Sequence, residues 1–173
     1  MSPVKGLESC KRYIATHDAN GNSVYTDSPE QHFNPIPDFG GFARSFSVGS
    51  VPANLENETD IKAYRAKKGP TSFTRAEIVN TMASGANLLV IDLAPGAKSA
   101  MHRTVSIDFS ICVQGEIKHE LDSGATVLLR PGVGTYLHSG ATTLTSCRII
   151  SSNEARIIDG TTRAHRSLLD LWQ

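Results

Sequence analysis

The stretch GAKSAMHRTVSIDFSICVQG, residues Gly96–Gly115, decides the fold of this chain. From residue 108 to 113 the letters DFSICV alternate between a small or polar side chain and a bulky apolar one. Side chains on a β-strand point to opposite faces in turn, so the alternation predicts a strand with one apolar face. The other face carries Asp108, Ser110 and Cys112. We expect that polar face to line a cavity.

Further short strands surround this stretch on both sides. Asn87–Leu93 precedes it as an apolar strand, and Ile117–Leu121 and Ala125–Arg130 follow it on either side of the turn Asp122–Gly124. Short strands separated by turn residues predict an all-β sandwich or barrel. We expect the consecutive strands after residue 108 to pair as an antiparallel meander.

The first half of the chain has a different pattern. Tyr13–Thr16 and Ser23–Thr26 flank Asn20-Gly21, a dipeptide that favours a tight hairpin turn. Three prolines and two glycines between residues 28 and 41 predict a surface loop or an arm. The stretch Thr59–Ala66 predicts a short surface helix.

The 173 residues are enough for one domain with a sizeable core. We divide it into an N-terminal arm, hairpin and helix (1–85), a barrel core (86–158) and a short C-terminal helical tail (159–173). Seventeen Lys and Arg balance seventeen Asp and Glu, which argues against nucleic acid or an anionic membrane as the partner. No apolar run is long enough for a signal peptide or a membrane span, so we expect a cytoplasmic protein. The three widely spaced cysteines predict reduced thiols.

Residue spacing in the opening stretch resembles the first cupin motif. In that motif a glycine is followed after five residues by His-x-His, then by an acidic residue and a second glycine. Gly96, His102, Asp108 and Gly115 keep these intervals, and Gly124–Gly132 resembles the start of the second motif. The resemblance implies an all-β fold, the cupin jelly-roll β-barrel.

Residues 12–138 further resemble small single-domain cupins of filamentous fungi. Several of those proteins are encoded in polyketide and other secondary-metabolite clusters and are described as oxidoreductases. The resemblance implies a tailoring enzyme acting on a small apolar metabolite. It also implies a homodimer, because cupins commonly pair through sheet packing and exchanged arms. After Ser139 the resemblance ends, through natural divergence or through an error in the gene model.

The chain departs from the cupin pattern at the metal-binding positions. His102 is kept, but Thr104 stands where the motif has its second histidine and Asp108 where it has glutamate. The second-motif histidine would fall at Thr142 or Thr143 and is absent. Three or four imidazole and carboxylate ligands normally hold a divalent metal, so we predict no cofactor. Iron, manganese, nickel or zinc at His102 and Asp108 is the alternative, with His119 or His138 as a third ligand if either faces inward.

The same residues suit acid–base chemistry without a metal. Histidine titrates near neutrality, a carboxylate can orient it, and a hydroxyl can position a substrate. The predicted catalytic residues are His102, Asp108 and Thr104, and the predicted substrate-binding residues are Ser110, Cys112 and His138. We keep three further alternatives: a metal-dependent oxidoreductase, a barrel that binds a ligand or partner without turnover, and a filled barrel in which His102 and Asp108 satisfy each other.

Overall fold

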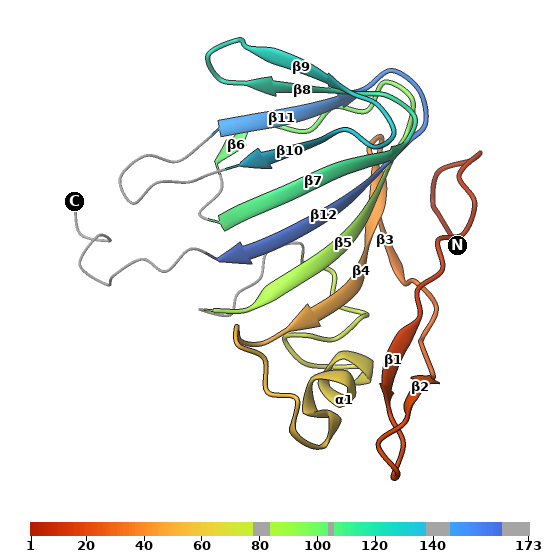
Figure 1. Cartoon of the computed structure of the whole chain (residues 1–173). Helices are drawn as coiled ribbons and strands as arrows, with labels where there is room; N and C mark the ends of the chain where they lie inside the picture. The colour runs from red at the N-terminus through yellow and green to blue at the C-terminus, as the bar shows by residue number, and fades with distance from the viewer. Residues whose placement is uncertain (78–83, 104–105, 138–145, 164–173) are drawn as a thin grey trace, which may run out of the picture.

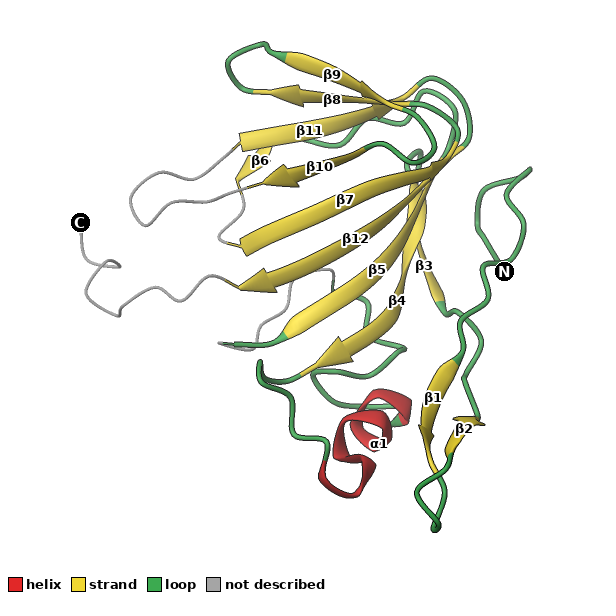
Figure 2. Cartoon of the chain, viewed as in Figure 1, coloured by secondary structure: helices red, strands yellow, loops and turns green. Residues whose placement is uncertain are grey.

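The computed structural model describes residues 1–77, 84–103, 106–137 and 146–163. Within these ranges the chain forms twelve strands, one α-helix and a single turn of 3-10 helix (Figures 1 and 2). The elements are β1 (Ile14–His17), β2 (Ser23–Thr26), β3 (Phe33–Ile36), β4 (Gly40–Val48), η1 (Glu56–Glu58), α1 (Thr59–Arg65), β5 (Ala86–Leu93), β6 (His102–Arg103), β7 (Ser106–Gln114), β8 (Ile117–Leu121), β9 (Thr126–Leu129), β10 (Gly134–Leu137), β11 (Ser146–Ser151) and β12 (Ala155–Arg163).

Two antiparallel sheets form the body of the barrel (Figure 1). One has the order β10-β7-β12-β5-β4-β3, and the other has the order β6-β11-β8-β9. The chain changes sheet between β7 and β8, and β12 returns to lie between β7 and β5. This is the connectivity of a jelly roll, so the predicted all-β jelly-roll fold is confirmed.

The predicted meander was wrong at the step from β7 to β8. Among the strands from β7 to β12 in the described residues, only β8 and β9 pair as neighbours in sequence, because β7 pairs with β10 and β12. Gly115, which lies between β7 and β8, has φ +78°, and a Cβ there would lie 2.2 Å from the Glu154 carbonyl oxygen. The chain therefore passes tightly against the turn before β12 and leaves the sheet. Alternation along a strand predicts its two faces but not its partners.

The proline-rich segment 28–41, which we predicted to be a loop or an arm, contains strand β3 and the start of strand β4. β3 and β4 pair with each other, and β4 continues the large sheet by pairing with β5. Pro35 lies within β3, which is the edge strand of that sheet. Proline has no N–H to donate, so an edge is the place in a sheet that tolerates it. Residues 40–48 consequently belong to the barrel, although we had placed them in the N-terminal arm.

The N-terminal hairpin and the helix pack outside the barrel as predicted. β1 pairs with β2, and the Asp18 carboxylate accepts the backbone N–H groups of Asn20 and Asn22 at 2.8 and 2.9 Å. Helix α1 buries Ile61 and Tyr64. The Tyr64 ring packs on Phe46, with 4.7 Å between the ring centroids.

A buried ion pair fastens the N-terminal segment to the sheets. The Arg156 guanidinium donates to both carboxylate oxygens of Asp92, at 2.5 and 2.7 Å, and the Asp92 side chain is fully buried. The same guanidinium donates to the Glu8 carbonyl at 2.8 Å. Residue 8 is thereby held against β12 and β5.

An apolar cluster fills one end of the barrel between the two sheets. Its fully or almost fully buried members are Leu93, Ala97, Cys112, Ile117, Leu129, Ala155 and Ile157. They lie near the ends of β5, β7 and β9 and the starts of β8 and β12. The interior beyond this cluster is free to carry polar groups.

The last strand extends further than predicted. β12 runs to Arg163, five residues beyond the expected end of the barrel core at 158. Residues 159–163 are therefore strand and not tail, because their backbone pairs with both β5 and β7. The predicted C-terminal helix otherwise falls at 164–173, outside the described residues.

Candidate functional site

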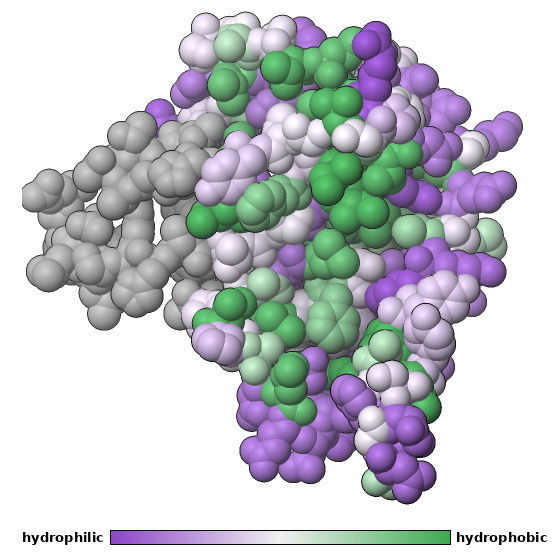
Figure 3. Space-filling view, viewed as in Figure 1, coloured by the Kyte–Doolittle hydropathy of each residue, from purple (hydrophilic) through white to green (hydrophobic). Residues whose placement is uncertain are grey.

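Strand β7 turns its predicted polar face inward. Asp108 is 5% exposed, whereas its neighbour Phe109 is 54% exposed and lies on the outer face. Ile111 and Val113 are exposed on that outer face as well. Figure 3 shows apolar side chains gathered over this side of the large sheet. The alternation read from the sequence therefore gives the correct orientation of the strand.

A second carboxylate, from β12, lies inside the barrel beside β7. Asp159 is directly opposite Ser110 in the register of the two strands. The Ser110 hydroxyl donates to Asp159 Oδ1 at 2.5 Å, and the Ser106 hydroxyl donates to Asp108 Oδ1 at 2.7 Å. Both carboxyl groups are thus held by serine hydroxyls on one strand, so their positions are fixed.

The environment of Asp159 makes it a weaker acid than a carboxyl group in water. Burial raises its pKa to about 6, and the negative charge of Asp108 adds to the rise. The hydrogen bond from Ser110 and the positive charge of His102 act in the opposite direction. A carboxyl group with this pKa exchanges its proton near neutral pH, which is what a general acid or base requires.

His102 lies on β6, in the facing sheet. Its Nδ1 is 3.0 Å from the Ala100 carbonyl oxygen, so Nδ1–H donates and Nε2 is left to accept a proton. In register it is opposite Cys147 of β11. The charge of His102 acts on Asp159, whereas the Asp108 carboxylate takes its hydrogen bond from Ser106. Among the described residues, His102 and Asp108 therefore do not satisfy each other.

One of the predicted site residues is packed in the core, and two cannot be placed. Cys112 is fully buried in the apolar cluster, where its thiol lies 3.5 Å from the Gln114 carbonyl oxygen. Burial raises the pKa of that thiol, so packing describes Cys112 better than substrate contact. Thr104 and His138 lie outside the described residues.

Three interior residues were missed or left open by the sequence reasoning. Asp159 was assigned to a tail helix, although a lone acidic residue after the apolar pair Ile157 and Ile158 is a signal for a strand position inside the barrel. His119 lies inside and is 5% exposed. Burial, and then the positive charge of His102, lower its pKa. Ile117, His119 and Leu121 occupy alternate positions on one strand, and this alternation predicts that His119 faces inward with the two apolar residues.

The third missed residue, Cys147, is 3% exposed. Burial raises its pKa to about 11, and the charges of Asp108 and Asp159 contribute. Its thiol therefore stays protonated and is not a nucleophile at neutral pH. Because the charges of Asp108 and Asp159 act on its pKa, Cys147 lies near the two carboxyl groups.

The prediction of no metal cofactor stays a prediction, because the candidate ligand His138 lies outside the described residues. Within the described ranges, no group of three or more histidine, cysteine, aspartate or glutamate side chains has a geometry that could hold a metal ion. Asp108 and Asp159 are already engaged by serine hydroxyls. We therefore derive no step through a metal.

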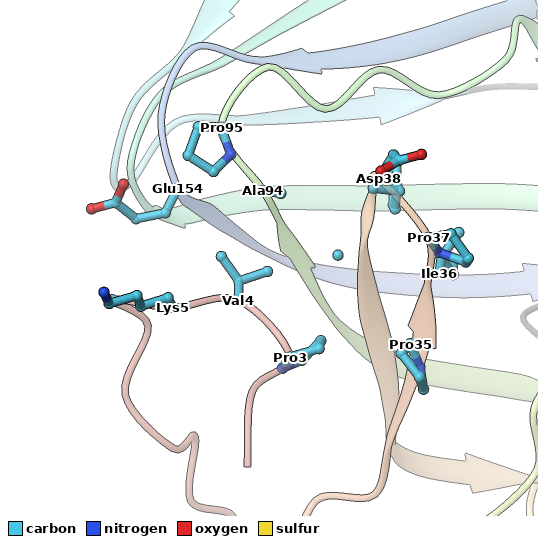
Figure 4. Close-up of a pocket in the computed structure, with 13 residues that line it drawn as sticks. Pro3, Val4, Lys5, Pro35, Ile36, Pro37, Asp38, Ala94, Pro95 and Glu154 are labelled. Carbon is cyan, nitrogen blue, oxygen red and sulfur yellow. The ribbon is translucent and has the colours of Figure 1, made fainter.

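A separate groove of about 790 Å³ lies outside the barrel, between the N-terminal segment and the turn from β3 to β4. Figure 4 shows Pro3 and Val4 on one side of it and Pro35 on the other. Its walls are mainly proline and aliphatic, and its charged residues do not converge on one point. The cluster of two carboxyl groups and two histidines is the better candidate for chemistry; Asp108, Asp159 and His119 are buried in it, and His102 is exposed.

Comparisons with known proteins agree with this architecture. No protein-family model matches the chain. It is 34% identical over 129 residues to phomopsin biosynthesis cluster protein C' of Diaporthe leptostromiformis, covering 73% of this chain and 65% of that protein. It is 33% identical over 132 residues to the cupin-domain-containing oxidoreductase srdB of Neurospora crassa, covering 75% and 62%. The matched segment thus spans a little less than two thirds of these relatives.

Solved structures of cupins resemble the chain more distantly. An RmlC-like cupin from Shewanella frigidimarina is 19% identical with a TM-score of 0.41, covering 46% of this chain and 67% of that one. KdgF from Halomonas is 18% identical with the same TM-score, covering 46% and 69%. The motif spacing, the two-sheet barrel and the relatives together make this protein a cupin. Within the cupins, it is similar to fungal proteins that are named as cupin-domain oxidoreductases or for biosynthetic clusters.

Proposed function

We propose that this protein is a cupin tailoring enzyme of fungal secondary metabolism that carries out proton-transfer chemistry on a small, largely apolar molecule inside the barrel. Support for the pathway comes from relatives named for phomopsin and oryzine biosynthesis clusters. Support for the site comes from carboxyl and imidazole groups that lie beyond an apolar core. Dehydration, isomerisation and cyclisation are the reactions that such a site serves.

The observation that carries the proposal is the buried Asp159, which the Ser110 hydroxyl holds and whose pKa burial raises to about 6. In an isomerisation, one group removes a proton from carbon beside a carbonyl and another delivers a proton to oxygen. His102 accepts through Nε2, and Asp159 donates. General acid–base catalysis of this kind contributes about 10²–10⁴-fold. No electron is transferred, so no oxidant is required.

The names of several relatives favour an oxidoreductase. That activity needs a redox partner, whereas proton transfer through His102 and Asp159 needs none. The residues therefore favour proton transfer within the tailoring class. Thr104 and His138 keep their predicted roles as proposals, while Ser110 positions the Asp159 carboxyl.

To test the proposal, the gene is replaced in its host by genes for variants, and the metabolites of each strain are profiled by mass spectrometry. We expect His102→Ala and Asp159→Asn each to lower the pathway product at least tenfold and to accumulate the same precursor. Asp122→Asn, on an exposed turn, is the matched control and leaves the product unchanged. Unchanged product in His102→Ala and Asp159→Asn would favour the alternative, a cupin that binds a ligand or partner without turnover.

A homodimer in the cytoplasm completes the proposal. The outer face of β7 and β10 exposes Phe109, Ile111 and Tyr136, an apolar surface that supports pairing of two copies. No helix in the described parts of the chain is long and apolar enough to cross a membrane. Light scattering of the purified protein tests the dimer, and Ile111→Lys is expected to yield a monomer.

A further inference from the structure

His119 brings an unpartnered polar atom into the barrel. Its strand alternates inward and outward, and Ile117, two residues earlier on the same face, belongs to the buried core cluster. The His119 side chain is 5% exposed, and its Nε2 has no hydrogen-bond partner among the described residues. The proposed chemistry at Asp159 does not use this atom.

A second unpartnered polar atom faces the interior from the opposite sheet. Thr135 of β10 is directly opposite Ser110, so both side chains lie on the inner face of the large sheet. Its Oγ1 is buried and, within the described residues, also lacks a partner. Buried polar atoms are costly to leave without hydrogen bonds. Each of these atoms is a buried polar group that a bound molecule would satisfy.

The electrostatics at His119 define the chemistry of that molecule. Burial and the positive charge of His102 lower the pKa of His119, so its ring is neutral. A neutral imidazole does not stabilise an anion as an ion pair would. No carboxylate contributes to the pKa of His119, so a cation would lack a counter-ion there. The complementary group is an uncharged oxygen.

We propose that His119 is a substrate-binding residue, whose Nε2 hydrogen-bonds an uncharged carbonyl or hydroxyl group of an otherwise apolar substrate. The inference rests on the proposed function for placing the substrate inside the barrel. Ile149 is opposite His119 in the register with β11 and packs against the apolar cluster, which gives the hydrocarbon part of the substrate its contact. The substrate class is therefore a neutral oxo or hydroxy compound and not a carboxylic acid or an amine.

Three probes with the same ring and different charge test this inference: cyclohexanone, cyclohexanecarboxylate and cyclohexylammonium. Each is titrated into ¹⁵N-labelled protein, and histidine side-chain nitrogens are followed by long-range ¹H–¹⁵N NMR. The His119 signals are assigned by their absence in His119→Gln. We expect cyclohexanone to bind most tightly and to shift His119 Nε2. Tighter binding of the carboxylate or the amine, or an unmoved Nε2 signal, overturns the inference.

Two variants separate hydrogen bonding from packing. His119→Leu keeps an apolar side chain but removes the polar atom, so cyclohexanone affinity falls about three- to tenfold. His119→Gln keeps a hydrogen-bond donor and is expected to retain most of the cyclohexanone affinity. Without a probe, His119→Leu raises the Tm by about 2–4 °C because an unpartnered buried group is removed. Unchanged affinity in the leucine variant overturns the inference, and if that variant does not fold, the glutamine variant and the NMR shifts still decide.

A further control separates this inference from the proposed function. His102→Ala is expected to bind cyclohexanone within about twofold of the original chain while losing pathway product. If the product persists in that variant but His119 binds as described, catalysis is refuted and the binding site stands. If His119 does not respond while the product is lost, the site inference is wrong and the proposed catalysis stands.

Discussion

Replacing Asp159 by asparagine is expected to stabilise the protein at neutral pH. The carboxyl pKa rises from 3.8 to about 6 in the folded state, mainly because the group is buried. At about 1.4 kcal/mol per pKa unit, the ionised form of Asp159 costs about 3 kcal/mol of folding free energy. Asparagine has no charge and keeps an oxygen that accepts the Ser110 hydroxyl. We expect the free energy of unfolding at pH 7 to rise by about 1–3 kcal/mol.

The stabilising effect of Asp159→Asn is expected to depend on pH. Because the folded-state pKa of Asp159 is raised, the folded state binds more protons than the unfolded state between pH 3.8 and about 6. The contribution of Asp159 is most favourable below pH 3.8 and is lost as the pH rises through 6. The gain from Asp159→Asn should therefore be near zero at pH 3.5 and should reach its full size above pH 7.

Urea denaturation followed by far-ultraviolet circular dichroism measures both values, at pH 3.5 and at pH 7.5. Asp122→Asn, on an exposed turn, is the matched control and should change stability by less than about 0.5 kcal/mol at either pH. An equal effect of Asp159→Asn at both pH values, or a loss of stability at pH 7.5, would refute the electrostatic reasoning.

Three further predictions concern the scaffold. Gly40→Ala should lower the free energy of unfolding, measured by urea denaturation, by more than about 3 kcal/mol, because its Cβ would lie 2.1 Å from the Asp92 carbonyl oxygen. Gly21 has φ +82° and open space around it, so Gly21→Ala should lower it by only about 1–2 kcal/mol. Asp92→Asn should lower the free energy of unfolding by about 3–5 kcal/mol, because it leaves the Arg156 charge buried without its partner. A smaller loss would indicate that the ion pair is exposed to solvent. A thiol reagent should modify only Cys10 in the folded protein, and rapid modification of a second thiol would contradict the burial of the other two cysteines.

Local features of the site were predictable from the sequence, and long-range pairings were not. The inward face of β7 follows from alternation within nine residues, so Asp108 and Ser110 could be placed inside the barrel. Asp159 is 49 residues from Ser110, and nothing in either segment specifies that they pair. β3 was missed because Pro35 is unfavourable in a strand and is tolerated here only at the sheet edge, a position that depends on the whole topology.

The position of β12 between β5 and β7 has a consequence for how the protein is synthesised. Both neighbours are complete by residue 114, yet the strand that joins them begins at residue 155. On the ribosome, those two strands emerge with their facing edges unpaired until β8, β9, β10 and β11 have also been translated. Exposed strand edges are where chains pair wrongly with one another. The stage of synthesis between these residues is when the nascent chain is most in need of a chaperone.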